Sequence, residues 1–196
     1  MVLMAWAQAP SLPTYKVDIG RSKVEINVFK GGLFKALGHD HIIAAKRFSG
    51  TVQFDAGNVK DSSVSFSVDS GSLTVLDPQA SGKDRSEVQA TMEGPEVLNV
   101  RAFPRITFHS TRVSDLAQSG DALEVTLTGR INLHGVEKET TFPVRVRFEK
   151  NLLHAIGTAT IAQTDFGIIP IKAGGGTVRV KDQLKISFDI LAEKTS

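Results

Sequence analysis

The most constraining feature of this chain is an alternation of apolar and polar residues with a period of two. Val64, Phe66 and Val68, for example, alternate with serines. Successive side chains of a β-strand point to opposite faces of a sheet, so each such segment has one apolar and one polar face. The same pattern occurs in segments 15–19, 23–28, 48–54, 63–68, 106–108, 123–133, 142–148 and 184–190. Segment 152–162 is also typical of a strand, but its phase is ambiguous.

This one-sided alternation predicts an antiparallel all-β fold. Strands of a parallel α/β sheet are covered on both faces and are apolar along their whole length, which is not the pattern seen here. Turn-forming residues separate the predicted strands at 19–21, 56–58, 118–121, 134–135 and 149–151. A sheet with this many strands buries its apolar face by closing into a barrel or by folding into a sandwich, and periodicity alone does not separate the two.

Two glycines occupy apolar positions of this pattern. Gly50 and Gly129 lie among Phe, Leu and Ile residues, where the missing side chains either leave a cavity or allow the strand to bend within a packed core.

One helical excursion interrupts the strands at about residues 84–98. Asp84 is followed three residues later by Glu87, which suits a capping box at the start of a helix. A Gly-Pro pair at 94–95 predicts its end.

Charge and cysteine content exclude several classes of function. The net charge is +2, and Lys and Arg are scattered among Asp and Glu, so the chain has no basic surface that would indicate nucleic-acid binding. The absence of cysteine excludes disulfides, thiolate metal sites and cysteine nucleophiles. Acidic residues are dispersed along polar strand faces, so no catalytic carboxylate pair is predicted and no cofactor is indicated.

The N-terminus has features of an export signal. Residues 1–13 begin with a short apolar run and contain Ala5-Trp6-Ala7, which matches the small-residue pattern that signal peptidase cleaves. We interpret this segment as a signal-peptide remnant, or else as a frayed terminus, and residues 14–196 as one domain. The chain has no segment with the roughly 18 apolar residues of a membrane span. A periplasmic or secreted protein is therefore expected.

Several motifs, in order, resemble those of the YceI-like family of polyisoprenoid-binding proteins. The matching segments are Tyr15-Lys16-Val17-Asp18, Ser22-Lys23-Val24, Phe48-Ser49-Gly50-Thr51-Val52-Gln53-Phe54-Asp55, Phe103-Pro104-Arg105-Ile106-Thr107-Phe108-His109-Ser110, Gly129-Arg130-Ile131-Asn132-Leu133-His134-Gly135-Val136 and Asp165-Phe166-Gly167. They extend from about residue 14 to 192. The resemblance implies an elongated, lipocalin-like antiparallel β-barrel, of a kind exported to the bacterial periplasm, that binds a long isoprenoid or similar lipid in an apolar tunnel and has no catalytic residues.

A barrel of this kind would bind its ligand through the apolar faces of its strands. The predicted tunnel residues are Leu37, Ile42, Ile43, Phe48, Val52, Phe54, Val64, Phe66, Val68, Phe108, Leu127, Ile131, Phe142 and Val144. Strand phase determines the face on which a side chain lies but not its depth, so each of these residues contacts either the ligand or only the core.

The segment His39-Asp40-His41 departs from the commonest family pattern. In an extended segment, His39 and His41 share a face. One interpretation is a polar mouth or head-group site, with Leu37, Ile42 and Ile43 forming an apolar lip around it. A second is a divalent metal site, with His109, His134 or His154 as a third ligand. The third is a purely structural turn. His109 and His134 are expected to face solvent, which weakens the metal interpretation.

The sequence thus predicts a non-enzymatic carrier or scavenger of a hydrophobic lipid, which could be a polyisoprenoid, a quinone or a fatty-acyl amphiphile. Two alternatives are a metal-binding protein or hydrolase that depends on His39 and His41, and an interaction module whose barrel is packed with its own side chains. Pairing of two chains as a homodimer along an edge strand is left open.

Overall fold

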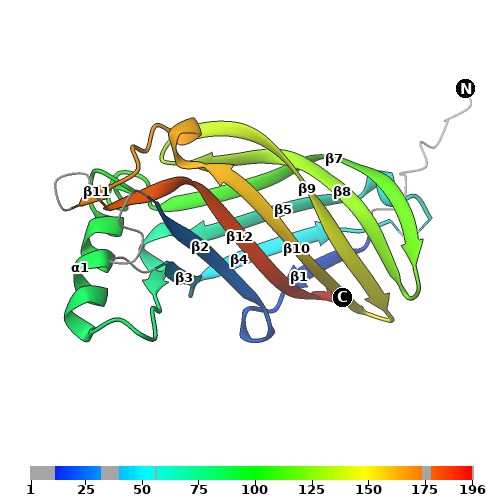
Figure 1. Ribbon diagram of the computed structural model, residues 1–196. Helices are drawn as coiled ribbons and strands as arrows, with labels where there is room; N and C mark the ends of the chain where they lie inside the picture. Colours follow the sequence, from blue (N-terminus) through cyan, green and yellow to red (C-terminus); the bar gives the residue numbers. More distant parts are fainter. Residues whose placement is uncertain (1–11, 32–39, 56, 174–177, 196) are drawn as a thin grey trace, which may run out of the picture.

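The protein forms an elongated antiparallel β-barrel with an α-helix at one end (Figure 1). The computed structural model describes residues 12–31, 40–55, 57–173 and 178–195. The strands are β1 (Thr14–Val17), β2 (Lys23–Gly31), β3 (His41–Ala45), β4 (Phe48–Gln53), β5 (Ser63–Asp69), β6 (Leu73–Val75), β7 (Arg105–Ser119), β8 (Ala122–Leu133), β9 (Val136–Glu149), β10 (Leu152–Ala162), β11 (Lys172–Ala173) and β12 (Val178–Lys194). The helix is α1 (Gly82–Glu93), and short 3-10 turns are η1 (Ile19–Arg21), η3 (Val59–Asp61), η4 (Ser70–Ser72) and η5 (Gln163–Phe166).

The barrel closes because β1 pairs on both of its edges. Tyr15 in β1 lies opposite Val52 in β4 and opposite Lys194 in β12. The ring of eight strands therefore runs β1, β4, β5, β7, β8, β9, β10, β12 and back to β1. All of these pairings are antiparallel, which confirms the predicted fold class.

A second group of strands extends the wall at the end where α1 lies. β12 pairs with β2 between Arg179 and Asp189, β2 pairs with β3, and β3 with β6. Gln89 of α1 then covers β6, since its side-chain amide accepts a hydrogen bond from the Val75 N–H at 2.9 Å and donates one to the Leu73 carbonyl at 2.7 Å. The helix thus satisfies backbone groups of a strand that is too short to show a sequence period.

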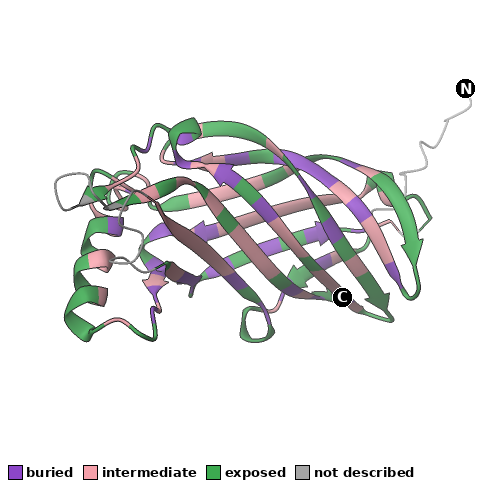
Figure 2. Cartoon of the chain, viewed as in Figure 1, coloured by how far each residue is buried: buried purple, intermediate pink, exposed green. Residues whose placement is uncertain are grey.

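The alternation predicted from the sequence is visible in the burial of the strands. Buried and exposed positions alternate strictly along β4, and they also alternate from Phe142 to Arg145 in β9 (Figure 2). The two-residue turn between β8 and β9 consists of His134 and Gly135, which have φ angles of 53° and 77°. Both values lie in the left-handed region that suits a tight hairpin, and this explains the turn predicted there.

The helix begins earlier than predicted and its cap differs, whereas it ends at the predicted Gly-Pro pair. Ser81 is the N-cap residue, and its hydroxyl accepts a hydrogen bond from the N–H of Asp84, so Asp84 lies inside the helix rather than at its cap. The expectation that Asp84 caps the helix was wrong, because a serine three residues before it fills that position. The helix ends at Glu93, before Gly94, and the segment 95–98 is a turn.

Some predicted features lie outside the described residues. The proposed signal remnant falls there except for its last two residues, and so do Leu37 and His39. Within the described residues, no helix has the length and apolar character required to cross a bilayer.

Candidate functional site

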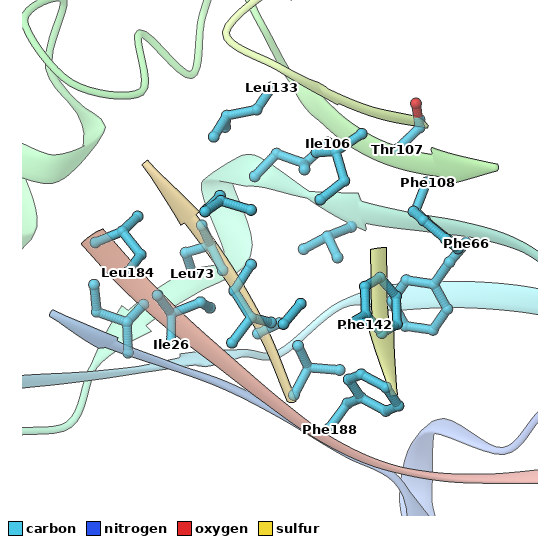
Figure 3. A pocket seen from close by; sticks show the side chains of 18 of the residues that line it. Ile26, Phe66, Leu73, Ile106, Thr107, Phe108, Leu133, Phe142, Leu184 and Phe188 are labelled. Atoms are coloured by element: carbon cyan, nitrogen blue, oxygen red, sulfur yellow. The ribbon is translucent and has the colours of Figure 1, made fainter. Parts of the chain in front are cut away.

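The barrel encloses an apolar cavity of about 600 Å³. Every strand of the eight-stranded ring except β1 contributes several lining side chains, and Val17 contributes from β1. Figure 3 shows Ile26, Leu73 and Leu184 on one side of this space and Phe66, Phe142 and Phe188 on another. The cavity exists because inward-facing side chains of an eight-stranded barrel can leave room for one small ligand.

Most of the predicted tunnel residues line this cavity. They are Ile43, Val52, Phe54, Val64, Phe66, Val68, Phe108, Leu127, Ile131, Phe142 and Val144. Their contact with a ligand remains a prediction, because strand phase and cavity geometry establish only that they face the interior space.

Two predicted residues lie elsewhere. Phe48 is buried but is not among the lining residues, because its ring stacks on Phe66 with centroids 5.5 Å apart. Ile42 also does not line the cavity, since His41 and Ile43 are its neighbours in β3 and point to the interior face. Of the two predicted lip residues that the structure describes, it brings only Ile43 to the cavity.

Phenylalanine rings cover the glycines in the apolar phase. A Cβ atom added to Gly50 would lie 2.6 Å from Cδ2 of Phe66, and one added to Gly129 would lie 2.5 Å from Cε2 of Phe108. Gly157 in β10 has the same relationship to Phe188 in β12. The glycines therefore do not create the cavity directly. They let aromatic rings lie flat against neighbouring strands, which leaves the centre of the barrel open.

These aromatic side chains form a connected row inside the barrel. The centroid of Phe142 lies 5.5 Å from that of Phe108 and 5.8 Å from that of Phe188. All three residues line the cavity. Phe188 was not among the predicted site residues, although its alternation in segment 184–190 would have placed it on the same face.

A second aromatic group lies near the C-terminal end of β4. Tyr15 packs edge-on against Phe54 and Phe148, with centroids 6.3 Å and 5.8 Å away. Tyr15 is only 2% exposed, and burial raises the pKa of its hydroxyl. Phe54 also lines the cavity, so this group lies next to it at the end distant from α1.

Ionisable groups gather at the α1 end of the cavity. Three lining residues among those described carry them: His41 of β3, Glu87 of α1 and Arg179 of β12. Nδ1 of His41 lies 2.6 Å from Oδ2 of Asp77, a residue that follows β6 and is 4% exposed. Asp77 was not among the predicted site residues, because nothing in the local sequence indicates that it lies beside a histidine 36 residues away.

The other histidines do not assemble into a metal site. His109 is exposed beside Ser65, as predicted from its phase. His134 lies in the β8–β9 turn and contacts Phe103, although it is half-buried rather than facing solvent freely. His154 pairs with Asp189. No group of three or more potential metal ligands occurs within the part of the chain that the structure describes.

Comparison with known proteins agrees with this architecture. A family model described as a YceI-like domain matches residues 15–192. Proteins described as Protein YceI from Salmonella arizonae and Salmonella paratyphi B are each 29% identical over 133 residues, which cover 67% of this chain and 61% of the relative. The match thus spans less than two thirds of the relatives' own length.

Two solved structures are similar in fold. BcnA from Burkholderia cenocepacia has a TM-score of 0.69 at 21% identity, covering 89% of this chain and 98% of BcnA. A polyisoprenoid binding domain from Saccharophagus degradans, implicated in plant cell wall breakdown, has a TM-score of 0.64 at 14% identity, covering 92% of this chain and 98% of that domain. At these identities, the comparison shows a shared barrel fold.

Proposed function

The chain belongs to the family of YceI-like domains, and on that premise we propose that its barrel binds the tail of a long-chain hydrophobic lipid without converting it chemically. The tail would be a polyisoprenoid chain, the side chain of a quinone, or a fatty-acyl chain. The description of the Saccharophagus degradans domain as polyisoprenoid binding supports the first of these.

The shape and lining of the cavity carry this proposal. Its volume of about 600 Å³ lies within the range of roughly 300–1,000 Å³ that is common for small-molecule sites. Val125 and Leu133 of β8 both line it. The stretch of strand between them, tilted by roughly 40° to the barrel axis, spans about 20 Å along that axis. The site is therefore long as well as apolar, which suits a chain-like ligand.

Burial of the tail supplies the binding energy. Transfer of each CH₂ group from water to an apolar site contributes about 0.8 kcal/mol, so a chain of many carbons gains affinity without directed hydrogen bonds. The ionisable lining residues lie at the α1 end, while Phe188 of the aromatic row lies opposite Val24, four residues along β2 from the partner of His41. A lipid with its tail in the barrel and its polar head near α1 fits this distribution.

The cellular role that we propose is transport or sequestration of this lipid outside the cytoplasm. The Ala5-Trp6-Ala7 pattern supports export. An extracytoplasmic barrel would shield the tail from water while the lipid is away from a membrane.

A displacement assay tests tail binding. A fluorescent apolar reporter that brightens in the cavity is titrated with geranylgeranyl methyl ether, a prenyl chain with a small neutral head. The proposal predicts saturable displacement with one site per chain. Failure of both the reporter and the ether to bind would contradict it.

A further inference from the structure

Asp77 holds the His41 ring in one orientation. Its Oδ2 accepts the hydrogen bond from Nδ1 of His41, and its Oδ1 accepts one from the backbone N–H of Ile42 at 2.8 Å. The backbone carbonyl of Asp77 also accepts a hydrogen bond from Arg85 of α1. Both carboxylate oxygens therefore have a partner, and the side chain has no freedom to turn away from the ring.

This contact determines which nitrogen of a neutral His41 ring carries the proton. An ionised carboxylate only accepts hydrogen bonds, so Nδ1 must be the donor. The opposite nitrogen, Nε2, then has a free lone pair and acts as an acceptor. Within the described residues, Nε2 of His41 has no protein hydrogen-bond partner.

The His41 ring lies where a lipid head would be. Its side chain lines the cavity and is 24% exposed. In β3, His41 lies opposite Val28, which is close to the end of β2 at the α1 side of the barrel. The ring therefore combines a position at the polar end of an apolar cavity with one unused acceptor.

We infer that His41, oriented by Asp77, recognises a hydroxyl group on the lipid head, as in a polyprenol or a quinol, by accepting a hydrogen bond at Nε2. This inference rests on the proposed function, because a head reaches His41 only if its tail fills the barrel. It goes further by assigning the class of head group: one that donates a hydrogen bond and carries no charge.

Other head groups fit this end of the cavity less well. An ether or carbonyl oxygen presents lone pairs to the lone pair of Nε2 and cannot donate. A phosphate or carboxylate would bring negative charge near the buried Asp77 carboxylate, where the low dielectric makes like-charge repulsion strong. Arg179, which is exposed and also lines the cavity, is the group that would favour an anionic head instead. Ligands that share a tail and differ only in the head group distinguish these cases.

The test compares three ligands with the same tail. Geranylgeraniol, geranylgeranyl methyl ether and geranylgeranyl phosphate each displace the reporter from the wild-type protein. We expect the alcohol to bind roughly three- to tenfold more tightly than the ether, the gain from one hydrogen bond. The phosphate is expected to bind no more tightly than the ether.

Asp77→Asn is the decisive variant. The introduced asparagine can still accept a hydrogen bond from the Ile42 N–H, but its NH₂ group donates to Nδ1 of His41, which moves the ring proton to Nε2. Both the alcohol and the ether can then accept from Nε2–H. We expect the ether to bind more tightly than it does to the wild type and the difference between the two ligands to disappear. A purely structural role for Asp77 would weaken all three ligands alike.

The control is Asp189→Asn. Asp189 pairs with Nε2 of His154 at 2.7 Å, and neither residue lines the cavity, so the same substitution should leave all three affinities unchanged. If Asp77→Asn fails to fold, as judged by thermal unfolding, His41→Phe replaces it. That variant keeps a ring but has no acceptor, and should bind alcohol and ether equally.

The ways in which the inference can fail are distinguishable. Equal binding of alcohol and ether to the wild type would overturn the hydroxyl site and leave tail binding intact. Tightest binding of the phosphate would overturn it in favour of an anionic head at Arg179. If none of the three ligands displaced the reporter, the proposed function would fail, and the head-group site with it.

Discussion

Gly157 of β10 lies directly opposite Phe188 of β12, and the ring of Phe188 occupies the space where a Gly157 side chain would be. A ring that lies against the barrel wall leaves the centre open, so this contact links a missing side chain to the size of the cavity. Phe66 over Gly50 and Phe108 over Gly129 repeat the arrangement.

Substitution Gly157→Ala should therefore destabilise the barrel. The new methyl group would collide with the Phe188 ring and lie 2.9 Å from the Pro143 carbonyl oxygen. We expect a loss of about 1–3 kcal/mol in the free energy of unfolding, measured by urea titration. The control is Gly82→Ala, the same change at the start of α1, where the nearest atom is 4.0 Å away. Its stability should be unchanged or slightly higher. A Gly157→Ala protein as stable as the control would contradict the packing role of this glycine.

Narrowing the cavity should weaken tail binding without unfolding the protein. Ala159 lines the cavity and is 4% exposed, so Ala159→Phe places a ring in the tail site. We expect the affinity for geranylgeranyl methyl ether to fall roughly tenfold or more, because the ligand loses the apolar space that binds it. Thr160→Phe adds the same ring at the next, exposed position of β10 and should leave affinity unchanged. If both variants bound the ether equally well, the ligand would lie elsewhere.

Removal of the Gln89 side chain should loosen α1 from β6. Gln89→Ala leaves the Val75 N–H and the Leu73 carbonyl without their partners. Unsatisfied polar groups of this kind cost about 1–3 kcal/mol. Hydrogen exchange at the Val75 amide should accelerate while exchange in β8 and β9 stays slow. Ser86→Ala, on an exposed part of the same helix, is the control and should not change the exchange rate at Val75. Unaltered protection of Val75 in Gln89→Ala would show that Gln89 does not hold the helix.

Asp182 should stabilise the folded state at neutral pH, and this contribution should be lost as the pH becomes acidic. Hydrogen bonds from the hydroxyl and the backbone N–H of Thr164 lower the pKa of Asp182 below its ordinary value of 3.8. A carboxyl whose pKa is lowered in the folded state stabilises the fold above the unfolded-state pKa, and this stabilisation is lost as pH falls through the folded-state pKa. Arginine partners lower the pKa of Asp18 and Asp69 in the same direction.

Urea unfolding at about pH 5, 4 and 3 measures this contribution. In Asp182→Asn, the loss of stability between these values should be smaller than in the wild type, because one of the contributing carboxyl groups is gone. It should not vanish, since Asp18 and Asp69 remain. Identical pH dependence in the two proteins would exclude a role for Asp182.

Local patterns in the sequence were sufficient to predict most of the barrel. Alternation along segments such as 63–68 and 123–133 indicated both the strands and the faces that point inward, because the side-chain period of a strand is independent of the rest of the fold. The strand β6 was not predicted, because its three residues are too few to show an alternation of apolar and polar side chains. The cap of α1 was misplaced by three residues, because Asp84 and Ser81 are both residue types that cap helices.

The details of the site depend on contacts between distant segments. Phe48 and Phe66 share an apolar phase, yet only Phe66 lines the cavity, since stacking buries the other ring. The partnership of His41 with Asp77 requires β3 and β6 to be neighbours, which the residues around either one do not reveal. The hollow centre likewise depends on strand register, because register decides that Phe188 lies over Gly157.

Native mass spectrometry of the purified protein, combined with solvent extraction of whatever it carries, tests the central claim that the barrel binds a lipid tail. After delipidation and incubation with geranylgeranyl methyl ether, the wild-type protein should show one added ligand per chain, and Ala159→Phe should show a smaller bound fraction at the same ligand concentration. A wild-type protein that carries no extractable lipid and acquires no ligand under these conditions would contradict the account.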